Sequence, residues 1–88
     1  MTRRYRVEVA AEIAEAFFAL AAVDQKLGIL EDTKIRLKNA EAAATERLRV
    51  GQAGQADVLR ASLELTQIDE VVIGLEAERD ARTARINA

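Results

Sequence analysis

The residues of this chain that could bind a metal are carboxylates placed at helical spacing. They stand in three pairs along the sequence: Glu12 with Glu15, Glu64 with Asp69, and Glu76 with Asp80. Carboxylate sites of this kind in helix bundles usually combine Glu with a His three residues further along, and this sequence contains no histidine. We therefore interpret the acidic pairs as solvated helix faces and expect neither a metal site nor a cofactor.

Nucleophilic chemistry has no better support in the sequence. Ser62 is the only serine and has no histidine to activate it, and cysteine is absent. The run GQAG at residues 51–54 is not followed by the Lys-Ser or Lys-Thr of a phosphate-binding loop. We expect no catalytic residue and predict that the chain is not an enzyme.

Charge and hydropathy argue against two further classes of function. The 13 basic and 15 acidic residues are mixed along the chain and give a net charge of −2, which disfavours nucleic-acid binding. The basic cluster Arg3, Arg4 and Arg6 is interpreted as a flexible, solvated terminus. The apolar stretch IAEAFFALAAV is too short to cross a bilayer, so we expect no membrane span in this segment. No secretion signal is visible, and a role in an envelope compartment would make these 88 residues part of a longer chain.

Two long helices with heptad-spaced apolar residues are predicted to position these side chains, one at about residues 7–50 and one at about residues 55–87. Lys34 and Glu41 interrupt the first series, and Arg79 and Arg82 break the second. The apolar or small residues of the two series are Ala16, Leu20, Val23, Leu27, Leu30, Leu37, Ala44 and Leu48, then Val58, Ala61, Leu65, Ile68, Val72, Leu75 and Ile86.

A turn at about residues 51–54 is predicted to join the helices. Gly51 suits the left-handed position that follows a helix, and Gly54 is an acceptable N-cap for the next one. Asp57 then falls in the first turn, where its charge meets the positive end of the helix dipole. The predicted fold is all-α: residues 1–88 form one long antiparallel two-helix coiled-coil hairpin, with Ala44 near Ala61.

Apolar residues off this seam predict a need for further neighbours. The first helix carries Ile13, Phe17, Ile29 and Ile35, and the second carries Leu59, Leu63, Ile73, Ala77, Ala81 and Ala84. Apolar flanks on two sides favour self-association, either as a barrel of helices or as a four-helix bundle of two hairpins. The periodicity leaves both open.

The tip resembles that of the TolC-like family of outer-membrane efflux proteins. The family pattern of Val-Gly, a short variable run and Asp-Val-Leu reads here as VGQAGQADVL at residues 50–59. An Ala-rich stretch with aromatics leads into the first helix in the same way. The resemblance implies one hairpin of an α-barrel: the periplasmic part of a trimeric outer-membrane channel, represented here by a fragment.

The same resemblance implies partners and site residues. Val50, Gly51 and Gln52 would form the tip that contacts the periplasmic adaptor, which joins the channel to an inner-membrane pump. Asp57 would lie near the pore constriction, although its first-turn position is explained by helix capping alone. Arg60 stands where some pore-lining hairpins have an acidic residue, which leaves gate pairing and ion selectivity unsupported.

Two other interpretations stay open. The chain could be a freestanding coiled-coil module that dimerises and scaffolds partners. It could also be the hairpin of an adaptor protein, although that family places a leucine seven residues after its tip arginine and this chain has Ala56 after Arg49. No residue indicates which substrate passes through such a channel.

Overall fold

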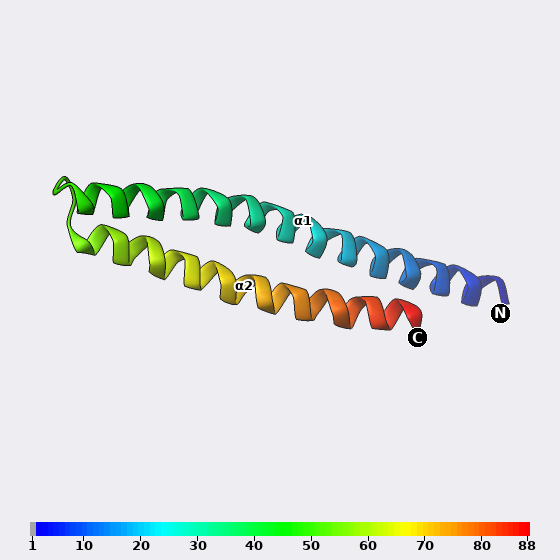
Figure 1. Cartoon of the computed structure of the whole chain (residues 1–88). Coiled ribbons are helices and arrows are strands. Elements are labelled where there is room, and N and C mark those ends of the chain that lie inside the picture. The colour runs from blue at the N-terminus through cyan, green and yellow to red at the C-terminus, as the bar shows by residue number, and fades with distance from the viewer. Residues whose placement is uncertain (1) are drawn as a thin grey trace.

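The computed structural model, which describes residues 2–88, is a long antiparallel pair of helices (Figure 1). Helix α1 spans Thr2–Arg49 and helix α2 spans Gln55–Asn87. The pair measures 74 × 15 × 15 Å, so the structure is a narrow hairpin with no second layer. The predicted all-α hairpin is therefore confirmed.

The core is a single line of side chains between the two helices. Only Val23, Leu27, Ala44 and Ala61 are buried among residues 2–88, and all four belong to the predicted heptad series. The other seam residues are half-buried, apart from Leu48 next to the tip, which is exposed. A seam made of Ala, Val and Leu lets the helices approach closely, but it shields only one side of each.

Three polar contacts cross the seam and fix the register of the helices. The Ser62 hydroxyl donates a hydrogen bond of 2.7 Å to Glu41 Oε2. Lys34 Nζ lies 2.6 Å from Asp69 Oδ1, and an Arg79–Asp24 pair at 4.0 Å follows further from the tip. From the first contact to the second, the paired positions lie seven residues further from the tip on both helices, and from the second to the third they lie ten residues further on both. We call these three contacts the cross-helix rungs. Lys34 and Glu41, which interrupt the apolar series in the sequence, each form one of them.

Helix α1 is longer than α2, and within residues 2–88 no part of α2 lies beside its N-terminal part. Lys34 is level with Asp69, so Asn87, eighteen residues further along α2, is level with Ala16. We call residues 2–15 of α1 the overhang; it projects beyond the C-terminal end of α2 (Figure 1). The helix begins at Thr2 rather than near residue 7. The basic cluster of residues 3–6 is consequently helical, and its side chains are exposed to solvent as predicted.

Ile13 corrects another detail of the sequence analysis. Its predicted place is on the flank, yet it precedes Leu20 by one heptad and therefore lies on the seam face of α1. Its side chain is 51% exposed because α2 ends before reaching its level. The seam face of α1 thus continues into the overhang, where α2 does not cover it.

Candidate functional site: the hairpin tip and the outer flanks

The tip is closed by a well-defined helix C-cap. Gly51 has φ +78°, the only positive φ among residues 2–88. Its N–H donates to Leu48 O at 3.1 Å, and the Gln52 N–H donates to Arg47 O at 2.7 Å. These two bonds form a Schellman motif, which satisfies carbonyls that the end of α1 leaves free. The left-handed geometry at Gly51 therefore stops α1 and turns the chain.

Helix α2 begins with a weaker cap. Gly54 is the N-cap, with φ −85° and ψ 162°, and it has no side chain to accept a bond from the first turn. The Asp57 N–H donates to Gly54 O at 3.2 Å. Asp57 is the only acidic residue in the first turn of α2, so its charge is what stabilises the positive end of the dipole there.

An ion pair on α1 stands next to the tip. The Arg49 guanidinium donates from Nε to Glu46 Oε2 at 3.0 Å and from Nη2 to Oε1. These hydrogen bonds lower the pKa of the Glu46 carboxyl and raise the pKa of the Arg49 guanidinium. Arg49 also lies in the last turn of α1, where a positive charge suits the helix dipole.

The predicted tip residues are accessible in the hairpin. Val50 is 48% exposed, and Gly51 and Gln52 are exposed beside it. Asp57 and Arg60 are also exposed, on the first turns of α2, and none of the ion pairs within residues 2–88 joins them. The tip thus presents an apolar side chain and exposed polar groups at the far end of the helix pair.

The outer flanks carry large apolar side chains that the hairpin leaves in solvent. Six of them are between 55% and 66% exposed: Phe17, Ile29, Ile35, Leu59, Leu63 and Ile73. We call the first three the α1 flank and the last three the α2 flank. Exposed alanines accompany them, among them Ala77, Ala81 and Ala84. Phe18 and Val71 are further exposed apolar residues that the sequence analysis did not single out. Their heptad positions, off the seam, are the signal that could have identified them.

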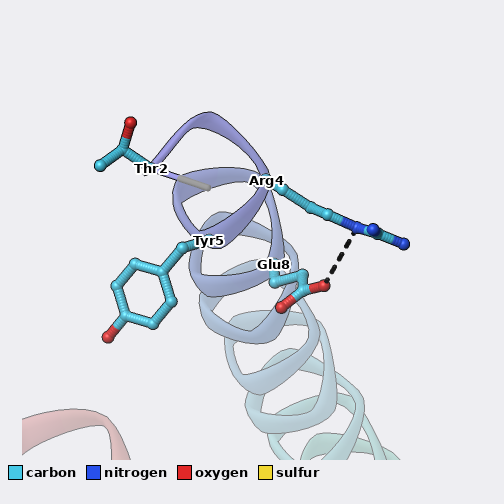
Figure 2. Close-up of a pocket in the computed structure, with 4 residues that line it drawn as sticks. All are labelled: Thr2, Arg4, Tyr5 and Glu8. Atoms are coloured by element: carbon cyan, nitrogen blue, oxygen red, sulfur yellow. Dashed lines mark ion pairs between the residues drawn. The ribbon is translucent and has the colours of Figure 1, made fainter.

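The side chains considered for chemistry serve structure or face solvent. Ser62 and Asp69 form the cross-helix rungs. Within residues 2–88 no three His, Cys, Asp or Glu side chains lie close enough together to hold a metal ion. A shallow hollow near the N-terminus is lined by Thr2, Arg4, Tyr5 and Glu8. Figure 2 shows that all four project from one helix, so the hollow is a gap between exposed side chains.

Comparisons with protein-family models, with curated proteins and with solved structures find no match for this chain. Among residues 2–88, neither helix has a segment apolar and long enough to cross a membrane.

Proposed function

We propose that this chain is a non-enzymatic structural hairpin that packs side by side with other hairpins through both flanks. The arrangement we favour is the periplasmic tunnel of a trimeric TolC-like efflux channel. The single observation that carries this proposal is the imbalance between covered and uncovered apolar surface. Four residues are buried between the helices, whereas six large apolar side chains on the flanks stay more than half exposed.

The flanks supply enough apolar surface to drive lateral packing. Burying a Leu, Ile or Phe side chain completely is worth about 1.5–3 kcal/mol, so covering the exposed part of each flank residue is worth roughly 1–2 kcal/mol. The three α2 flank residues lie on one side of that helix and give a gross gain of several kcal/mol with the neighbour that covers them. On α1, Phe17 and Ile35 share one face, whereas Ile29 lies about 120° around the helix from both, so two residues serve one neighbour there. Flanks on both α1 and α2 suit a ring, in which every hairpin has a neighbour on either side.

The tip supplies the second part of the proposed function. The Schellman motif holds Val50, Gly51 and Gln52 in one conformation, and their exposure leaves them free to contact a periplasmic adaptor. A pre-formed turn binds with little ordering cost. Asp57 and Arg60, on the first turns of α2, would then lie close to the narrow end of the tunnel.

The mechanism follows from the stiffness of the pair. The cross-helix rungs and the seam hold each hairpin together, while the flanks that it offers to neighbours are apolar and exposed. Opening the tunnel would be a small sliding of whole hairpins past one another, driven by the adaptor at the tip. The exported substrate would meet the inner surface of the tunnel and form no covalent bond with it.

The localisation part of the proposal is tested on the native gene. We expect the reading frame around these 88 residues to continue into alternating strands and a second hairpin. An antibody against the hairpin should detect a protein several times larger in the outer-membrane fraction. An 88-residue product in the cytosol would contradict the channel and favour the freestanding coiled-coil scaffold.

The lateral-packing part is tested on the chain itself. Replacing the α2 flank with Leu59→Gln, Leu63→Gln and Ile73→Gln should abolish chemical cross-linking between hairpins and leave the helix content unchanged. The matched control replaces exposed polar residues of the same helix, with Glu64→Gln, Thr66→Ser and Glu70→Gln. If the control and the flank variant cross-link equally, lateral packing through the α2 flank is refuted.

A further inference from the structure

A shallow hollow lies between the helices on the side of the hairpin away from the cross-helix rungs. Val71 follows the rung residue Asp69 by two positions, which places the two side chains about 200° apart around α2. Val71 is 50% exposed, so this surface is open to solvent. The hollow is lined by two residues of α1 and four of α2: Thr33, Leu37, Glu64, Gln67, Ile68 and Val71.

Ile29 and Gly74 lie on the same side as the hollow. Ile29 is one turn from Thr33, whose hydroxyl donates to Ile29 O at 2.9 Å, and its side chain is 58% exposed. Gly74 is three residues from Val71 and is also exposed. The residues at intervals of seven from Ile29 and Thr33 on α1, and from Val71 and Gly74 on α2, form what we call the hollow side.

The cross-helix rungs fix the height of every residue on the hollow side. Lys34 is level with Asp69, so Ile29, five residues before Lys34, is level with Gly74, five residues after Asp69. By the same count, Lys26 of α1 is within one residue of the level of Glu78, and Arg47 is within one residue of that of Asp57. At these three heights the two helices carry complementary groups: a large side chain and a glycine, and twice a basic and an acidic residue.

The single hairpin does not bring these complementary groups together. Among the ion pairs within residues 2–88, none joins Lys26, Arg47 or Asp57. An added Cβ at Gly74 would meet no atom within 4 Å, so the Ile29 side chain does not occupy the space there. The complementarity is therefore available to a second molecule.

We propose that a second copy of this chain covers the hollow side with its tip at the same end, so that α1 of each copy lies on α2 of the other. The two-fold axis then runs along the hairpins, and every residue keeps its height in the second copy. Ile29 of one copy enters the space at Gly74 of the other. Lys26 meets Glu78 of the other copy, and the two hairpins form a four-helix bundle.

The charges of the hollow side favour this orientation. Its two other basic residues on α2, Arg60 and Arg85, lie at the height of alanines of α1, so no like charges meet at one level. A copy with its tip at the opposite end, centred on Val71, would set α2 against α2. Glu64 and Glu78 are each seven residues from Val71, so they would then face each other, which disfavours that orientation.

This contact goes beyond the lateral packing proposed above and does not depend on it. Lateral packing uses the α2 flank and the face of Phe17 and Ile35, neither of which the second copy covers here. Only two large apolar side chains per copy, Ile29 and Val71, enter the hollow-side contact. We therefore expect a weak dimer, with a Kd between about 10 µM and about 1 mM. Cross-linking below that range reports the flanks alone.

Sedimentation equilibrium on the variant with Leu59→Gln, Leu63→Gln and Ile73→Gln provides the first test. This variant lacks the α2 flank but keeps the hollow side, so it should show a monomer–dimer equilibrium up to about 1 mM. Adding Ile29→Asp should weaken dimerisation by about tenfold or more, because the two-fold axis repeats the change. Ile35→Asp is the matched control: Ile35 is 59% exposed on another face of α1, and its replacement should leave dimerisation unchanged.

The glycine provides a second test in the same variant. Gly74→Leu should raise the melting temperature at low micromolar concentration, because leucine favours a helix more than glycine does and its Cβ meets open space. The same change should weaken dimerisation, since it fills the space that Ile29 of the other copy enters. Gly28→Leu should raise the melting temperature similarly and leave dimerisation unchanged.

Disulfide trapping tests the orientation, because the chain has no cysteine of its own. Ala40→Cys and Glu64→Cys, in separate chains, lie on the hollow side at the same height to within one residue. An oxidised equimolar mixture of the two chains should yield the mixed disulfide in excess of both homodimers. Helix content by circular dichroism should be the same for both, since both positions are exposed.

Three results would overturn the proposal. The first is an α2-flank variant that stays monomeric up to about 1 mM. The second is equal weakening of the dimer by Ile29→Asp and Ile35→Asp. The third is a mixture of cysteine variants in which the mixed disulfide is no more abundant than the homodimers. A native chain that fails to cross-link at low micromolar concentration, while the α2-flank variant still dimerises as described, would refute lateral packing and support the hollow-side contact.

Discussion

Replacing Gly51 with alanine tests whether the turn of the hairpin depends on left-handed backbone geometry. At φ +78° an added Cβ meets no neighbouring atom within 4 Å, so the effect of the change comes from the backbone alone. The left-handed conformation costs a residue with a Cβ about 1–2 kcal/mol. Alanine also lowers the conformational entropy of the unfolded chain, which stabilises the folded hairpin by about 0.4–1 kcal/mol. The net effect is a decrease of roughly 0.5–1 kcal/mol in the free energy of unfolding.

The same substitution at Gly28 provides the matched control. Gly28 lies within α1, and an added Cβ there also meets nothing within 4 Å. Alanine is favoured over glycine inside a helix by about 1 kcal/mol, so Gly28→Ala should stabilise the hairpin. The two variants change the unfolded chain in the same way, and the difference between them isolates the native geometry at the tip.

Thermal unfolding followed by circular dichroism at low micromolar concentration measures this difference. The expected gap of about 1.5–2 kcal/mol corresponds to melting temperatures roughly 10 °C apart, with Gly51→Ala below the native chain and Gly28→Ala above it. A shift of the same sign for both variants would show that α1 does not end in a Schellman motif at Gly51.

Two further outcomes follow from the polar contacts. Ser62→Ala should lower the free energy of unfolding by about 1 kcal/mol because Glu41 loses its cross-helix donor, as urea denaturation would measure. The Thr66 hydroxyl bonds only the backbone of its own helix, so Thr66→Ala should have almost no effect. Equal losses of stability in the two variants would contradict a stabilising Ser62–Glu41 contact. Arg49 lowers the pKa of Glu46, so their pair stabilises the fold above the ordinary carboxyl pKa of 4.5 and ceases to do so as the pH falls through the lowered value. The stability difference between the native chain and Arg49→Gln should therefore shrink from about pH 5 to about pH 3, and a constant difference would refute this linkage.

The seam and the tip could be predicted from the sequence because both depend on local chemistry. Heptad spacing places Val23, Leu27, Ala44 and Ala61 on one face, and these are the buried residues of the hairpin. Gly51 is favoured at the end of α1 because it adopts a positive φ at little cost.

The polar rungs and the overhang could not be predicted in the same way. Whether Lys34 meets Asp69 depends on the register, and heptad spacing fixes the register only to within a residue or two. The hydrogen bond and the charge of Asp69 raise the pKa of Lys34, so the structure reveals a partner where the sequence shows only an interruption. The early start of α1 is not evident from the sequence because clustered arginines are typical of solvated termini, although arginine is also a good helix former.

The unequal sequence separation of the rungs has a consequence for the order of folding. Glu41 and Ser62 are 21 residues apart, Lys34 and Asp69 are 35 apart, and Asp24 and Arg79 are 55 apart. Closing the longest of these loops directly would cost about 0.9 kcal/mol more chain entropy than closing the shortest. The chain should therefore close first beside the turn and zip toward its ends, so that the last contacts to form are also the first to open.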